Sequence, residues 1–292
     1  MSEDAPTYLQ FPLCLLAYGM TEQERLTTIL AHGLWHLGVS CAEGRAAADM
    51  QEIIEAEYSR EQWPSGLPKR WSLDQAVMMI GRQRFKIQHG SMPADLDRVQ
   101  AARQFHDQWT TRHGSQPFVR IRSDAFWNTF QNGTMPYRSF SVLCAVYCGI
   151  GARKKMVLTQ DRIRAMALGY KAPTMLAADP DFVKACREPG KLKATKAPGQ
   201  ERLLPLRTDK AKPLSAFQLR ATLNDLEGAG WFARVSDGRR HWFSHHVNRD
   251  ALVEMLKTRF KHRNAASTNR RADREALHAV KHPPGYDSAQ SY

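Results

Sequence analysis

Residues 214–246 read LSAFQLRATLNDLEGAGWFARVSDGRRHWFSHH, and this stretch decides the fold that the sequence predicts. Ser215 and Gln218 stand at the spacing of a capping box, which predicts that a helix begins at Ser215. Apolar residues then recur at the spacing of one helix face, and Gly228 or Gly230 suits the helix end. The predicted buried stripe consists of Leu219, Leu223 and Leu226.

Two aromatic-rich runs follow the helix and are joined by an Asp-Gly pair at 237–238. Asp-Gly suits a tight hairpin turn because both central residues of the turn must tolerate positive φ. Aromatic residues such as Trp231 and Trp242 pack well on a pleated surface. An isolated hairpin is only marginally stable in water, so we expect the hairpin over 231–246 to pack against the helix over 215–228.

The positive charge of the chain is unevenly distributed. The 292 residues carry a formal net charge of +13. Residues 1–115 hold 11 Lys and Arg against 14 Asp and Glu, whereas residues 116–292 hold 31 against 15. A basic second part indicates a polyanionic partner, with nucleic acid as the first choice. We expect residues 1–115 to mediate oligomerisation or partner contact instead.

Cysteine usage and hydropathy predict the compartment. The five cysteines form no CxxC pair, which favours a reducing compartment over a disulfide framework. The apolar run FPLCLLAYG at 11–19 is short and contains Pro12, so it makes a poor signal peptide. No apolar run is long enough to span a bilayer. The sequence therefore predicts a cytoplasmic protein without membrane contact.

The chain divides into three predicted parts. Residues 1–115 form a helical module, because their apolar positions recur at helical spacing. Residues 116–260 mix helices with short strands and include a basic, irregular insertion over 171–213. Residues 261–292 are polar and basic and are expected to form a disordered tail.

In chain order, residues 138–246 predict a helix, a short strand, a helix, the basic insertion, a helix, a strand, an Asp-Gly turn and a strand. This order resembles the winged-helix branch of the helix-turn-helix family. The resemblance is carried by LTQDRIRAMALGY (158–170), LSAFQLRATLNDLEGAGWFARV (214–235) and DGRRHWFSH (237–245).

The resemblance implies a mainly α fold, in which the N-terminal helical module precedes a winged-helix region made of helices and a small β hairpin. It also implies that helix 215–228 enters the major groove of double-stranded DNA while the hairpin, or wing, contacts the backbone. The connection of over 40 residues between the second and third helices departs from the family pattern. Residues 171–187 could instead complete a first winged helix, giving a tandem pair.

The DNA-contacting residues follow from the predicted faces of the helix and the wing. Arg can read guanine, and Asn or Gln can read adenine, through paired hydrogen bonds to base edges. Cationic side chains on the wing would hold phosphates. The predicted base readers are Gln218, Arg220 and Asn224, and the predicted phosphate contacts are Arg234, Arg239 and Arg240.

Metal ligation is the first alternative to test against the sequence. His32 and His36 lie one helical turn apart with Cys41 nearby, so two zinc ligands are geometrically possible. Their apolar surroundings favour core histidines instead. Cys144 and Cys148 share one helix face in so apolar a segment that core packing is the better interpretation. We therefore expect no metal site.

Catalytic motifs are the second alternative. His245 and His246 would point to opposite faces of a strand, which excludes a working pair. Asp179 and Asp181 flank Pro180, a pattern that favours a helix start over a nuclease metal site. The sequence has no phosphate-binding GKS/T loop and no nucleophile elbow. We expect neither catalytic residues nor a cofactor, and so no enzyme.

The first functional hypothesis is a transcriptional regulator that binds an operator as a homodimer through its N-terminal module. The alternative is a replication initiator of a plasmid or phage. This alternative is suggested by VRIRSDAFWNTF (119–130), by YRSFSVLCAVYCGIG (137–151) and by the possible tandem winged helices. A nuclease or another nucleic-acid-processing enzyme is the further alternative.

Overall fold

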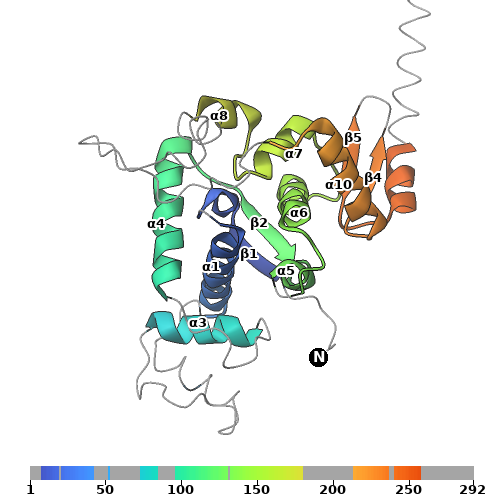
Figure 1. Ribbon diagram of the computed structural model, residues 1–292. Coiled ribbons are helices and arrows are strands. Elements are labelled where there is room, and N and C mark those ends of the chain that lie inside the picture. Colours follow the sequence, from blue (N-terminus) through green and yellow to red (C-terminus); the bar gives the residue numbers. More distant parts are fainter. Residues whose placement is uncertain are drawn as a thin grey trace, which may run out of the picture.

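The structure is a computed structural model that describes residues 8–19, 21–42, 52, 73–84, 96–130, 132–179, 213–236 and 240–257. These residues are mainly helical and include two small antiparallel sheets (Figure 1). The predicted mainly α fold class is therefore confirmed for the described residues. The predicted tail over 261–292 lies outside the described residues. None of the described helices is long and apolar enough to cross a membrane.

The first strand, β1 (Tyr8–Pro12), pairs in antiparallel register with β2 (Phe118–Arg122). Leu9 and Phe11 of β1 are fully buried. The sequence predicts a strand at β2 but only helices before residue 115, so β1 corrects that prediction. Its partner lies far along the chain, and local periodicity carries no sign of such a pairing.

The helix that packs on this sheet is itself flanked by two others. The helix α1 (Glu22–Ala42) contacts β1, α3 (Leu73–Arg84) and α4 (Leu96–His113) (Figure 1). The α1 helix begins with a capping hydrogen bond, in which the backbone N–H of Glu24 donates to Thr21 Oγ1 at 3.1 Å. The helical character predicted for this part is therefore confirmed for these segments.

The backbones of α1 and α3 touch where the helices meet. A Cβ atom at Gly38 would lie 1.9 Å from the carbonyl oxygen of Val77. A Cβ atom at Gly81 would lie 1.8 Å from the carbonyl oxygen of Leu34. Glycine at both positions therefore permits a separation between the helices that no other residue type allows.

The centre of the fold is α6 (Tyr137–Ile150), which follows β2 and α5 (Ser123–Phe130) (Figure 1). Nearly all its side chains are buried, as predicted for a segment that is apolar all round. The helix ends at a glycine: Gly151 has a φ of 57°, and its N–H donates to the carbonyl of Tyr147.

Two further helices pack on α6. The helix α7 (Gln160–Met166) begins at Thr159, whose Oγ1 accepts from the backbone N–H of Arg162. The helix α10 (Ala216–Gly228) contacts both α6 and α7. Between them, α8 (Pro173–Ala178) begins with a proline in its first turn, which corrects the prediction of an irregular segment there.

The second sheet contains β3 (Met156–Val157), β4 (Ala233–Ser236) and β5 (His241–Ser244) in the order β3-β5-β4. The predicted hairpin strands thus form an antiparallel pair, and the predicted short strand joins their sheet. A helix described over 249–257 covers the sheet. Leu252 and Leu256 of this helix pack against Ala233 and Trp242.

One hydrophobic core runs through both parts of the chain. It contains fully buried side chains from β1 and from η1 (Leu13–Ala17), together with side chains of α1, α4, α6, α7 and α10, and it extends to Phe243 of β5. The sequence predicts a division at 115/116, and residues on both sides of that position share this core. The difference in charge between the two parts is therefore a difference between regions of one packed body.

A buried polar cluster ties the end of α4 to the segment after α8. The hydroxyl of Tyr170 donates to Asp179 Oδ2 at 2.8 Å. His113 Nε2 lies 3.2 Å from Asp179 Oδ2, and Arg112 Nη2 lies 3.6 Å from Asp179 Oδ1. The Asp179 side chain is fully buried in this cluster. The helix start predicted at Pro180 lies outside the described residues and stays a prediction. The companion residue Asp181 lies outside the described residues.

Candidate nucleic-acid interface

The helix α10 begins with the capping box that the sequence predicts. The backbone N–H of Gln218 donates to Ser215 Oγ at 3.1 Å, and the backbone N–H of Ser215 donates to Gln218 Oε1 at 3.0 Å. The side-chain oxygen of Gln218 is therefore bound at the start of its own helix. This contact competes with the predicted use of Gln218 as a base reader.

The two faces of α10 differ in the predicted way. Leu219, Leu223 and Leu226 are buried against the core. Arg220 and Asn224 lie on the exposed side. The most exposed apolar side chain on this helix is Phe217, of which 80% is accessible to solvent.

A polar link joins α10 to the first hairpin strand. Arg234 Nη2 donates to Asn224 Oδ1 at 2.6 Å and lies 2.8 Å from Glu227 Oε2. The Arg234 side chain is 17% exposed. The sequence predicts a phosphate contact for Arg234, but in the structure its guanidinium faces the helix. The signal that the sequence analysis missed is Glu227, a carboxylate one turn beyond Asn224.

Of the other two arginines predicted to contact phosphates, the structure describes one. Arg240 is exposed and immediately precedes β5. Arg239 lies outside the described residues, as do the predicted turn residues Asp237 and Gly238. The part of the sequence before α10 is also basic. Residues 137–171 hold seven Lys and Arg residues and one acidic residue, Asp161.

A pocket of about 330 Å³ lies between α7, α10 and the hairpin. It brings together three of the predicted site residues, Arg220, Asn224 and Arg234. Gln218 and Arg240 are not part of its lining. Polar residues that the sequence analysis did not select also line it, namely Gln160, Glu227, Ser236, His241 and Arg249.

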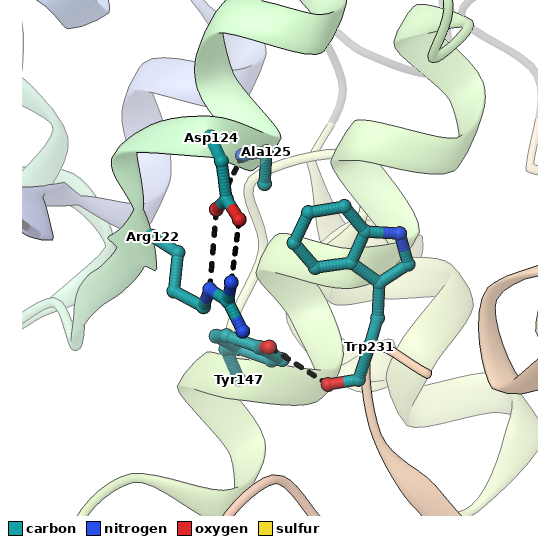
Figure 2. Close-up of polar contacts among 5 residues, drawn as sticks. All are labelled: Arg122, Asp124, Ala125, Tyr147 and Trp231. Carbon is teal, nitrogen blue, oxygen red and sulfur yellow. Dashed lines mark hydrogen bonds and ion pairs between the residues drawn. The ribbon is translucent and has the colours of Figure 1, made fainter. Parts of the chain in front are cut away.

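The segment between α10 and β4 is held by residues of β2, α5 and α6 (Figure 2). The hydroxyl of Tyr147 donates to the carbonyl oxygen of Trp231 at 2.8 Å. The guanidinium of Arg122 lies 5.4 Å from the centre of the Trp231 ring. Arg122 in turn makes a two-pronged ion pair with Asp124, whose hydrogen bonds raise the pKa of Arg122. The hairpin is thus anchored at its start by the central part of the fold.

The hairpin is also anchored at its end. The ring of His245 stacks on Tyr147 at 4.5 Å between ring centres, and the rings of His245 and His246 lie 3.9 Å apart. The prediction that these histidines point to opposite faces of a strand is wrong, because β5 ends at Ser244 and period-two alternation ends with it. Burial and the neighbouring His246 lower the pKa of His245 to about 4.

Among the metal and thiol candidates, His32 and Cys144 are buried, whereas His36 and Cys148 are partly buried. His32 is 4% exposed, and its ring lies 6.2 Å from that of His36. The Cys41 side chain is outside what the structure describes. Cys144 is fully buried, and burial raises the pKa of Cys148 to about 12. Within the described part of the chain, no group of three His, Cys, Asp or Glu residues is placed to hold a metal ion.

The buried His32 predicts a loss of stability in acid. Burial, followed by the charges of His36, His106 and Arg103, lowers the pKa of His32 to about 3. Above pH about 6.5 this residue is neutral in both the folded and the unfolded chain and contributes nothing. As the pH falls from about 6.5 toward 3, only the unfolded chain gains the proton. The free energy of unfolding should then fall by about 1.4 kcal/mol per pH unit.

The variant His32→Gln removes this titration and retains a polar side chain. Urea unfolding between pH 7 and pH 4 should give a shallower loss of stability for His32→Gln than for the unaltered chain. Equal slopes for the two proteins would show that His32 does not carry this pH dependence.

Comparison of the whole chain with protein-family models, with curated proteins and with solved structures finds no match.

Proposed function

We propose that this chain is a sequence-specific double-stranded DNA-binding protein that acts as a transcriptional regulator. The observation that carries the proposal is the order α6, β3, α7, α8, α10, β4, β5 along the chain, combined with the sheet order β3-β5-β4. The strand β3 pairs with β5, and α10, which packs on α6 and α7, leads directly into the β4–β5 hairpin. This arrangement supports the proposal of a winged helix, in which α10 would be the recognition helix and β4–β5 the wing.

The long connection between α7 and α10 is compatible with this proposal. Both helices pack on α6, although more than 40 residues separate them in the sequence. Part of that connection, α8, directly follows α7 and contacts it. The tandem alternative over 171–187 stays a prediction, because residues 180–187 lie outside the described residues.

Charge supports a polyanionic partner. The seven Lys and Arg residues between 137 and 171 precede the recognition helix, and Arg220 and Arg240 lie exposed on the helix and beside the wing. Cations on such a surface would neutralise phosphates and release condensed counterions. Binding by the full-length chain should therefore weaken by about 0.9 log unit per log unit of salt for each phosphate contacted.

Two substitutions test the separate roles of helix and wing. Arg220→Ala should weaken binding to the preferred duplex by about 1–3 kcal/mol, with little effect on random DNA, because it removes a base contact. Arg240→Ala should weaken binding to both duplexes alike and reduce the salt slope, because it removes a phosphate contact. Both effects are measured by competition binding with selected and random duplexes.

The matched control is Arg103→Ala on α4, which removes an equal charge from a different part of the fold. This variant should bind both duplexes as the unaltered chain does. Full-strength binding of the preferred duplex by Arg220→Ala would mean that α10 does not read bases.

The layout of the bound sites separates the regulator from the replication initiator. A homodimeric regulator should select palindromic half-sites about one helical turn apart, and an initiator should select directly repeated sites. Footprinting of selected duplexes gives the layout, and sedimentation of the free chain gives the oligomeric state. Cleavage of supercoiled DNA in the presence of Mg²⁺ would favour the nuclease alternative instead.

A further inference from the structure

The outer face of α10 carries an aromatic ring without cover from the described fold. Phe217 is 80% exposed, whereas the other exposed large apolar side chains among the described residues, Leu73 and Phe118, are 49% and 39% exposed. Phe217 lies in the first turn of α10, between Ser215 and Gln218, the two residues of the capping box. A ring so exposed on a helix proposed to enter DNA indicates a contact in the complex.

The geometry of the helix defines what this face presents. Phe217, Ala221 and Asn224 are spaced by four and three residues, so they form one stripe opposite the buried leucines. Asn224 Oδ1 already accepts a hydrogen bond from Arg234, and Gln218 Oε1 accepts one at the cap. Over the first two turns of α10, this stripe therefore presents mainly a phenyl ring and a methyl group.

Arg220 flanks this apolar stripe and is exposed. Arg220 is a cation beside the ring, and segment 137–171 of the same chain is basic. This positive charge favours a polyanion over an apolar protein surface as the partner. In the major groove, thymine alone adds an apolar group, its 5-methyl, to the polar base edges. The first turns of a recognition helix are the part that meets these edges.

We propose that Phe217, assisted by the methyl group of Ala221, binds the 5-methyl group of thymine in the major groove. This inference rests on the proposed function and gives the site a chemical preference. The polar side chains that the sequence predicts to contact bases would then act beside an apolar side chain that contacts a base. Sequences with thymine under the start of α10 should bind more tightly than sequences that carry a pyrimidine without the methyl group.

The test compares two duplexes that differ only in that methyl group. One alternates adenine with thymine, and the other alternates adenine with uracil on the same deoxyribose backbone. The full-length chain should bind the thymine duplex about fourfold more tightly for each methyl group buried, from about 0.8 kcal/mol per buried carbon. Phe217→Ala should bring the ratio of the two affinities close to one.

Leu73→Ala is the matched control, because it removes another exposed apolar side chain from a helix outside the proposed interface. This variant should keep the full thymine preference. Thermal melting of Phe217→Ala should match that of the unaltered chain, since the ring packs on little of the fold.

Two results would overturn the inference and leave the proposed function standing. In the first, the unaltered chain binds the two duplexes equally. In the second, it binds mixed-sequence DNA but neither alternating duplex. A thymine preference that survives Phe217→Ala would also overturn it. A change of oligomeric state in Phe217→Ala would assign the ring to a protein interface instead. Absence of binding to any duplex would remove the proposed function together with the inference.

Discussion

Removal of residues 2–17 is expected to unfold the whole chain. The deleted segment contains β1 and η1, in which Leu9, Phe11, Leu13, Leu15 and Leu16 are all fully buried in the shared core. Each such side chain contributes about 1.5–3 kcal/mol on burial, and the total rivals the whole stability of a typical domain, about 5–15 kcal/mol. Circular dichroism and thermal melting should show no cooperative transition.

The control is removal of residues 2–6, which retains every residue of β1 and η1. This shorter deletion should melt at the temperature of the full chain. By the same reasoning, a fragment that begins at residue 116 lacks the partner of β2 and should not fold, so DNA binding has to be measured on the full chain. A cooperative transition at an unchanged temperature after removal of 2–17 would contradict the shared core.

The second large effect is expected from Asp179→Asn. The substitution preserves the shape of the side chain but removes the negative charge that Arg112, His113 and Tyr170 surround. Removing one partner of a buried ion pair costs about 3–5 kcal/mol, because the remaining polar groups stay desolvated. At a few degrees per kcal/mol for a chain of this size, the melting temperature should fall by about 10 °C.

Asp161→Asn is the matched control. Asp161 also pairs with an arginine, Arg164 at 3.3 Å, but its side chain is 75% exposed. An exposed pair contributes about 0–1 kcal/mol, so this variant should melt within a few degrees of the unaltered chain. Similar melting temperatures for the two variants would show that the Asp179 cluster does not stabilise the fold.

The sequence predicted the structure best where the signal is local. The capping box of Ser215 and Gln218 and the buried stripe that starts at Leu219 are both present in α10. The apolar surroundings of Cys144 predicted core packing, and this residue is buried in α6. Each of these features depends on residues within one or two helical turns of each other, where spacing alone determines the contact.

The features that the sequence did not predict depend on contacts between different secondary-structure elements. The strand that contains Leu9 forms only because Ile121 lies beside it. The direction of the Arg234 side chain is set by its ion pair with Glu227 of α10. The sequence did not predict this pairing, because a guanidinium binds both phosphate and carboxylate groups. Side-chain direction at such a site follows from tertiary packing, which period and propensity do not encode.

The pairing of β1 with β2 also sets the order of events during synthesis. Tyr8 pairs with Arg122, so the first strand leaves the ribosome well before its partner exists. At about 5–20 residues per second, β1 waits for several seconds with its edge and its apolar side chains unpaired. Non-local pairing of this kind slows folding, and an unpaired strand is a template for aggregation. The nascent chain should therefore be most vulnerable between the emergence of β1 and that of β2, and chaperone binding should concentrate in that interval.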